Sequence, residues 1–373
     1  MCVRRLILVC LVVLSACGPA KAIPPASSSF RSASPSASLA TSGNAVVNVS
    51  CRLPISLLQS SGGVRGLFVS LPGGAFSFDP GGVFEPGTDG RLKSVAQPYL
   101  YGSGQSFAEA GAGATYTRRY GRWLPMKVAA VSPDSSHYAY NEFVDSPSRH
   151  SQIHVVDVTT GADSVLYDQD FYVVLDYRSE GVYLVNVGPT GEGAAGLWLL
   201  DPNSRSLRQV TPALADAAPF GFYLIGAGAA WYGDVASGDQ PPNQGIGAMD
   251  RVLRFDLKTH AVTPWFRRQG MQVQAIGFDS QEHLIVMATT ELAGIAAQQG
   301  HGSVELWLVT GPGVGQEIYS TSKSPDFVGS FSAPLADDHG VWFGTSVGVF
   351  LYTSDGKFTK VSEAQGEVAG RCS

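Results

Sequence analysis

The chain has 373 residues, of which 44% are hydrophobic and 15% charged, and its formal net charge at pH 7 is −6. An acidic chain of this kind lacks the positive surface that holds a phosphate backbone, so nucleic acid is excluded as an expected partner. Helical periodicity is nearly absent, and short aromatic or β-branched runs alternate with turn residues among 44 glycines. These features predict an all-β protein.

The N-terminus has the pattern of an export signal. Arg4 and Arg5 precede an apolar segment, 6–14, which is too short to cross a bilayer because a spanning helix needs about 20 residues. The letters LSAC that end at Cys17 resemble the lipobox of bacterial lipoproteins, in which cleavage before the cysteine is followed by attachment of a diacylglycerol to its thiol. The resemblance implies a signal peptide over 1–16, lipidation of Cys17 and a place on the extracytoplasmic face of a bacterial cell membrane. The alternative is an ordinary secretory signal in which the cysteine is incidental.

The composition changes after the lipobox. Residues 17–45 are rich in Ala, Ser and Pro and contain almost no large apolar side chain, which predicts a tether between the lipid and a folded domain. Residues 46–373 show no second linker of similar bias, so we expect them to form one domain.

The clearest repeat unit lies near the C-terminus. Residues 337–361 contain short apolar runs at 342–343, 349–352 and 358–361, separated by tight turns. Their wording resembles the repeat of two-component-regulator propellers, which implies a β-propeller.

Earlier copies of the unit can be aligned along the chain. The segment Ser132–Ser136 resembles the SPDG turn of TolB-type and related WD40-like propeller repeats, and Asp157–Gly161 resembles their hairpin between the outer strands. Both are turns in which Asp accepts local backbone hydrogen bonds. Five copies are recognisable, at 127–167, 171–210, 220–266, 273–319 and 327–361.

The region 51–126 must supply a divergent sixth copy. Its strand candidates are 67–71, 75–78, 115–120 and 122–124, with turns at 72–74 and 80–82. The expected fold is therefore a β-propeller of six blades, each of four antiparallel strands, with seven or five blades as alternatives.

Two cysteines remain in the predicted domain, one at each end. Cys51 and Cys372 lie in a chain with an export signal, so we predict a disulfide between them, with two free thiols as the alternative. Either 46–50 or 367–370 could supply the strand that completes the ring beside that bond.

Sequence motifs of catalysis are absent. No HExxH, CxxC or P-loop pattern occurs and no GxSxG nucleophile elbow is recognised, so no catalytic residue, cofactor or metal site is predicted. His150 and His154 lie about 13 Å apart if the segment is a strand, too far to share a metal, and we interpret both as surface or turn histidines. Asp337–His339 is interpreted as a hydrogen-bonding turn. Four tryptophans in or beside strands are assigned to blade packing: Trp198, Trp265, Trp307 and Trp342.

Two insertions are the expected binding elements, because loops on one rim of a rigid propeller usually build its binding surface. They contain polar side chains that suit a glycan or peptide, although any solvated loop contains similar residues. The candidate ligand-binding residues are Asp239, Asn243, Gln244, Gln298, Gln299 and His301.

The sequence favours a lipid-anchored, non-catalytic propeller that acts as a binding, sensor or scaffold module for an extracytoplasmic protein, peptide or envelope polymer. The alternative is a propeller-type polysaccharide hydrolase or lyase, in which carboxylates from separate blades meet about 5 to 10 Å apart.

Overall fold

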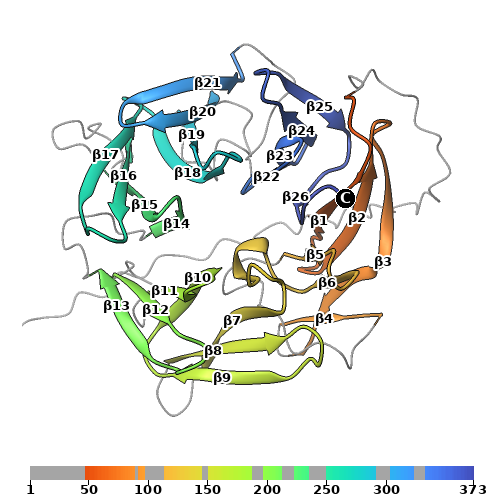
Figure 1. Ribbon diagram of the computed structural model, residues 1–373. Coiled ribbons are helices and arrows are strands. Elements are labelled where there is room, and N and C mark those ends of the chain that lie inside the picture. The colour runs from red at the N-terminus through yellow and green to blue at the C-terminus, as the bar shows by residue number, and fades with distance from the viewer. Residues whose placement is uncertain are drawn as a thin grey trace, which may run out of the picture. The chain divides into compact units, whose positions relative to one another are not determined.

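The computed structural model describes residues 47–88, 91–96, 113–144, 150–186, 196–211, 222–234, 249–290, 303–322 and 332–373. These residues form a six-bladed β-propeller of antiparallel blades, as the sequence predicts (Figure 1). Five of the predicted repeats each become one blade. The sixth blade is built from both ends of the described chain.

Blades 3 to 6 are four-stranded sheets in simple sequence order. Blade 3 consists of β10 (Tyr172–Arg178), β11 (Gly181–Asn186), β12 (Leu197–Leu200) and β13 (Leu207–Thr211). Blade 4 consists of β14 (Phe222–Gly226), β15 (Ala229–Asp234), β16 (Arg251–Asp256) and β17 (Val262–Arg267). Blade 5 consists of β18 (Gln272–Phe278), β19 (Leu284–Thr289), β20 (Val304–Gly311) and β21 (Val314–Ser320). Blade 6 consists of β22 (Leu335–Asp337), β23 (Gly340–Thr345), β24 (Gly348–Tyr352) and β25 (Phe358–Ser362).

Blade 2 has three strands, β7 (His137–Val144), β8 (His150–Asp157) and β9 (Asp163–Asp168). The predicted copy over 127–167 does not begin with a full strand. Val128–Ala130 form a 3-10 turn, η1, and a single bridge between Val131 and Tyr138 takes the place of a full strand.

Blade 1 closes the ring. Its strands are β1 (Arg52–Leu58), β2 (Val64–Ser70), β3 (Ala75–Pro86) and the short β4 (Leu92–Ser94), and β26 (Glu367–Val368) pairs with the inner side of β1. Of the two segments that could complete the ring, 367–370 therefore supplies the strand and 46–50 does not. The predicted disulfide is confirmed beside it, since Cys51 and Cys372 are bonded with their Cα atoms 5.6 Å apart.

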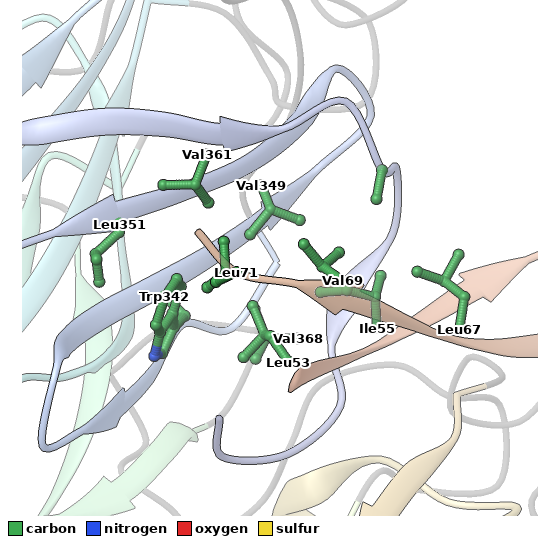
Figure 2. Packing of buried hydrophobic residues seen from close by; sticks show 11 residues of the cluster. Leu53, Ile55, Leu67, Val69, Leu71, Trp342, Val349, Leu351, Val361 and Val368 are labelled. Carbon is green, nitrogen blue, oxygen red and sulfur yellow. The ribbon is translucent and has the colours of Figure 1, made fainter. Parts of the chain in front are cut away.

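The seam between blades 1 and 6 is mostly apolar. Successive side chains of β1 and β2 point to opposite faces of the sheet, and four apolar ones share the face toward blade 6. These are Leu53, Ile55, Leu67 and Val69, none of which is more than 1% exposed. Figure 2 shows them packed against the buried side chains of blade 6, among them Trp342. Apolar burial across such seams is the main favourable term that holds neighbouring blades together.

The opposite side of blade 1 is covered by a hairpin that no blade contains. β5 (Thr115–Thr117) pairs with β6 (Arg122–Leu124), and its Trp123 lies against the sheet where Gly66 leaves room. A Cβ atom on Gly66 would lie 2.5 Å from that indole. The prediction of strands here is confirmed in position, but their assignment to the sixth blade is wrong.

Two further details of blade 1 differ from the prediction. The strand β1 was not predicted, because Pro54 interrupts its apolar pattern. The predicted turn at 80–82 lies inside β3, where a bulge shifts the register between the pairs Leu67–Phe78 and Arg65–Val83.

Candidate functional site

The antiparallel order of each blade gives the propeller two unlike ends. Connections from the first strand to the second and from the third to the fourth lie at one end, and the remaining connections lie at the other. We call the first end the turn face, because its connections are short: 179–180, 227–228, 257–261, 312–313 and 353–357. We call the other end the loop face. Its connections between second and third strands are 145–149, 187–196, 235–250 and 290–303 in blades 2 to 5.

Aspartates fix the turn face. Asp157 Oδ1 accepts hydrogen bonds from the backbone and hydroxyl of Thr160 at 2.7 and 2.9 Å, and Asp256 Oδ1 does the same with Thr259 at 2.8 and 2.9 Å. These bonds hold the pKa of both carboxyls below the usual range. His260 follows with φ of 61°, at the place where the repeat normally has Gly. Short anchored turns of this kind leave little freedom for ligand-specific loops.

The candidate ligand-binding residues lie outside the described residues. They are Asp239, Asn243, Gln244, Gln298, Gln299 and His301. The strands that flank them, β15 with β16 and β19 with β20, meet the loop face in neighbouring blades. Their role in binding stays a prediction.

Ion pairs fix the base of the longer insertion in blade 4. Arg251 pairs with Asp234 directly across it. Arg267 Nε donates to Asp250 Oδ2 at 2.9 Å, and Asp250 is only 5% exposed. Such half-buried pairs keep the strand ends in one arrangement whatever the loop does.

A third ion pair joins blade 4 to blade 5. Arg268 donates two hydrogen bonds to Glu305, at 2.8 and 2.7 Å, and Trp307 Nε1 donates to the same carboxylate at 2.8 Å. The guanidinium lies 5.4 Å from the centre of the Trp307 ring. The carboxylate raises the pKa of the Arg268 guanidinium. The loop face of blades 4 and 5 is therefore a rigid, charged rim.

The largest group of interacting ionisable side chains in the described residues lies between blades 1 and 2. His154 is 7% exposed, and its Nδ1 lies 2.9 Å from Asp163 Oδ1. Tyr140 stacks on the imidazole with ring centres 4.5 Å apart and donates its hydroxyl to Asp163 Oδ2 at 2.6 Å. His154 Nε2 lies 3.3 Å from Glu142 Oε2, outside hydrogen-bond geometry, and Glu142 pairs with Arg91 of blade 1.

This His154 cluster corrects the interpretation of both histidines as surface or turn residues. The strand itself is confirmed, but His154 is buried. His150 fits the interpretation better, since it is half-buried at the end of β8 and pairs with Asp168 at 2.7 Å. The signal that could have found the cluster is the hairpin register, because Tyr140 stands directly opposite His154 in the β7–β8 ladder.

The groups of the His154 cluster are bonded mainly to one another, with Asp163 at its exposed edge. Burial and the hydrogen bond to Asp163 raise the pKa of Tyr140. Burial alone would raise the pKa of Asp163, but the hydrogen bonds from His154 and Tyr140 outweigh it and the pKa is lowered. Because the polar atoms are turned toward one another and Tyr140 is fully buried, the arrangement suits a clamp between blades rather than an acid and base for a substrate.

One carboxyl on an innermost strand is strongly perturbed. Burial raises the pKa of Asp176 to about 6, against the opposing effect of Arg178, whose Nη2 lies 2.7 Å away. Arg178 also donates to the backbone oxygen of Ile225 in blade 4. Asp176 is 6% exposed, so this pair too is directed between blades.

The remaining predictions about single residues have mixed outcomes. Asp337 is confirmed as a turn residue, since its Oδ1 accepts the backbone N–H of His339 at 2.9 Å. Its Oδ2 accepts Trp342 Nε1 at 2.8 Å and the backbone N–H of Cys372 at 3.0 Å, which ties the turn to ring closure. Cys17 lies outside the described residues, and its lipidation stays a prediction.

The tryptophan assignments agree with the structure. Trp342 is fully buried, and Trp198, Trp265 and Trp307 each make aromatic contacts within or between blades.

Neither a metal-holding cluster of side chains nor a membrane-spanning helix is found in the described part of the chain. No group of three or more His, Cys, Asp or Glu side chains is arranged there to hold a metal ion. None of the helices in the described ranges has the length and apolar character needed to span a membrane.

No protein-family model matches the chain, and no curated protein matches it. Several solved propeller structures resemble it. TolB from Acinetobacter baumannii is 12% identical with a TM-score of 0.41, covering 86% of this chain and 67% of TolB. The acylaminoacyl peptidase of Pyrococcus horikoshii is 12% identical with a TM-score of 0.41, and the chain spans 46% of its length. A polysaccharide lyase, ulvan lyase, is 11% identical with a TM-score of 0.40 over 88% of this chain and 85% of the lyase.

The class that the fold defines is thus a six-bladed β-propeller. The solved propellers that resemble it include TolB, a peptidase and a lyase, at identities too low to assign an activity to this chain.

Proposed function

We propose that this protein is a lipid-anchored extracytoplasmic β-propeller that binds a protein, peptide or envelope polymer on its loop face and acts as a non-catalytic binding, sensor or scaffold module. The observation that carries the proposal is the unequal pair of faces. Short turns close one end of the blades, whereas the three longest connections between second and third strands, in blades 3 to 5, all belong to the other end. A rigid scaffold with its variable loops on one side is the usual design of a binding module.

The charged rim supports a role in recognition. Asp234, Asp250 and Glu305 are held by arginines at the bases of the two long insertions. Fixed loop bases lower the entropy that the loops lose on binding, which favours affinity.

The extracytoplasmic location is supported by two features. The Cys51–Cys372 disulfide belongs to an oxidising compartment. The lipobox-like sequence ending at Cys17 follows a segment with the length of a signal peptide.

The alternative, a polysaccharide hydrolase or lyase, would need two carboxyl groups that reach a substrate. Among the described side chains, Asp176 has the raised pKa that an acid needs, but it is buried against Arg178. We therefore prefer the binding module.

The anchor and the ring closure can be tested by intact mass. Protein purified from its native membrane should have the mass of a chain cleaved before Cys17 and carrying lipid, and reduction should add two hydrogen atoms. A Cys17→Ala variant should lose the lipid. An unlipidated mature chain would overturn the anchor.

The binding face can be tested by site-specific photo-crosslinking in the intact envelope. A benzoylphenylalanine at Ser303, on the loop face of blade 5, should give an adduct with the bound partner. The matched control at Thr160, on the turn face of blade 2, should give none. Equal adducts from both positions, or an adduct from Thr160 alone, would contradict the proposal.

A further inference from the structure

Two phenylalanines on blade 1 are exposed although the sheet face that carries them is mostly buried. Phe76 is 41% exposed and Phe78 is 52% exposed. They lie two residues apart on β3, opposite Val69 and Leu67 of β2, which are fully buried in the seam with blade 6. The apolar face of blade 1 therefore continues outward past the seam and ends in two aromatic rings at the surface.

The backbone beside these rings is also open in the described part of the blade. β3 pairs with β2 along its first half, but β4 reaches only Phe84, Glu85 and Pro86. Single exposed apolar residues are common, but two adjacent exposed aromatic rings beside an open sheet edge indicate an interaction surface.

The place where the chain enters the propeller identifies what covers this surface. Val47 and Val49 pack against the seam between blades 1 and 6, and the Cys51 carbonyl accepts the backbone N–H of Leu71 at 3.0 Å. Leu71 follows directly after β2, next to the turn that leads into β3 and Phe76. The segment before Val47 therefore joins the propeller at the turn face, close to the two phenylalanines.

That preceding segment is the predicted tether, and under the proposed function it ends in the lipid on Cys17. If residues 17–45 act as the predicted tether, their root-mean-square span would be about 30 Å, which would hold this corner of the propeller near the bilayer at high effective concentration. Even a weak surface contact becomes populated under such tethering.

We propose that Phe76 and Phe78 dock the propeller onto the surface of the lipid bilayer, with the turn face toward the membrane and the loop face turned away from it. The proposal rests on the lipid anchor of the proposed function. Transfer of an aromatic ring from water to the acyl boundary of a bilayer lowers its free energy. Arg65 is exposed on the same sheet face, and its positive charge suits lipid phosphate groups.

The test uses the lipidated full-length protein reconstituted into vesicles of phosphatidylethanolamine and phosphatidylglycerol. A Phe78→Cys variant carries an environment-sensitive dye on its introduced thiol, because Cys51 and Cys372 are bonded and Cys17 is acylated. The matched control is Leu58→Cys at the loop-face end of β1, where the leucine is 45% exposed.

The expected result is a blue shift of the dye at position 78, with loss of intensity when nitroxide lipids are included, and no change at position 58. Adding Phe76→Ser should reduce the shift at position 78. Equal responses at the two positions, or silence at position 78, would overturn the docking. A response that follows protein concentration in detergent without vesicles would overturn it in favour of a second copy of the chain.

Failure of the anchor is read separately from the intact mass. If the mass shows no lipid, a Cys17→Ala, Phe78→Cys chain that carries the dye at position 78 alone is mixed with the same vesicles. A shift at position 78 alone then supports the docking without the anchor, and silence overturns both.

Discussion

Removal of the Cys51–Cys372 bond gives the most direct test of how the ring is held closed. The bond joins residues 321 apart in the sequence. In the chain-entropy model a closed loop of this length stabilises the folded state by about 5 to 6 kcal/mol. That value is an upper bound, because residual structure in the unfolded chain reduces it.

The non-covalent closure remains when the bond is removed. Arg52 and Ser373 exchange two backbone hydrogen bonds, at 2.8 and 3.1 Å, and Ala369 donates its N–H to the Pro54 carbonyl at 2.9 Å. We therefore expect a Cys51→Ala, Cys372→Ala double variant to fold, with its free energy of unfolding lowered by about 3 to 5 kcal/mol.

The assay is urea unfolding of the oxidised protein, the reduced protein and the double variant. Reduction and double substitution should lower the unfolding midpoint equally and increase the slope, because the unfolded chain exposes more surface without the cross-link. A Ser50→Ala, Ser373→Ala variant is the matched control, since it changes neighbouring side chains and leaves the bond intact. Hydrogen exchange should show the faster opening confined to β1 and β26.

Two results would refute this reasoning. A loss below about 1 kcal/mol would mean that the bond does not constrain the unfolded chain. Faster exchange spread evenly over all six blades would mean that closure is not a local event.

Three other substitutions test packing and electrostatics by urea unfolding. Gly66→Ala should lower the free energy of unfolding by about 1 to 3 kcal/mol, because the added Cβ would lie 2.5 Å from the buried indole of β6. Gly73→Ala is the control and should have little effect, because no atom lies within 4 Å of its Cβ, and equal losses would contradict the packing. Asp176 has a folded pKa of about 6, above its unfolded value, so the stability it contributes is present below about pH 4 and is lost as the pH rises toward 6. Relative to Asp176→Asn, the free energy of unfolding should fall by about 3 kcal/mol over that range, and a constant difference between the two proteins would contradict this. His154→Ala should lower the free energy of unfolding by about 2 kcal/mol, because it removes a buried imidazole that contacts two partly exposed carboxylates. The more exposed His150→Ala should cost less than about 1 kcal/mol, and similar costs would mean that the His154 cluster is not a clamp.

The regular blades could be predicted because each repeats the same turn chemistry at the same interval. Asp157 and Asp256 mark the outer hairpins of two blades whatever residue follows them, as His260 demonstrates. For the strand that closes the ring, the sequence left two candidates, 46–50 and 367–370. A two-residue strand such as β26 carries too little local signal, and its pairing with β1 depends on contacts across the whole chain.

The misses share one physical cause, which is that tertiary contact overrode local pattern. Pro54 interrupts the apolar run of β1 but is tolerated beside the end of the short inner strand. The glycines at 81–82 predict a turn, yet they form a bulge that brings β3 past the buried indole of Trp123. The burial of His154 depends on Arg91 from another blade, so no local sequence window contains it.

The pairing of β26 with β1 also has a consequence in time. The inner edge of blade 1 stays unpaired until residues 367–368 have been synthesised and brought back to it, so the first blade to emerge is the last to be completed. Contacts of such large sequence separation form slowly, because the loop entropy is lost before they stabilise anything. For a chain that crosses a membrane unfolded, as its predicted export signal implies, this order would delay folding until translocation is finished.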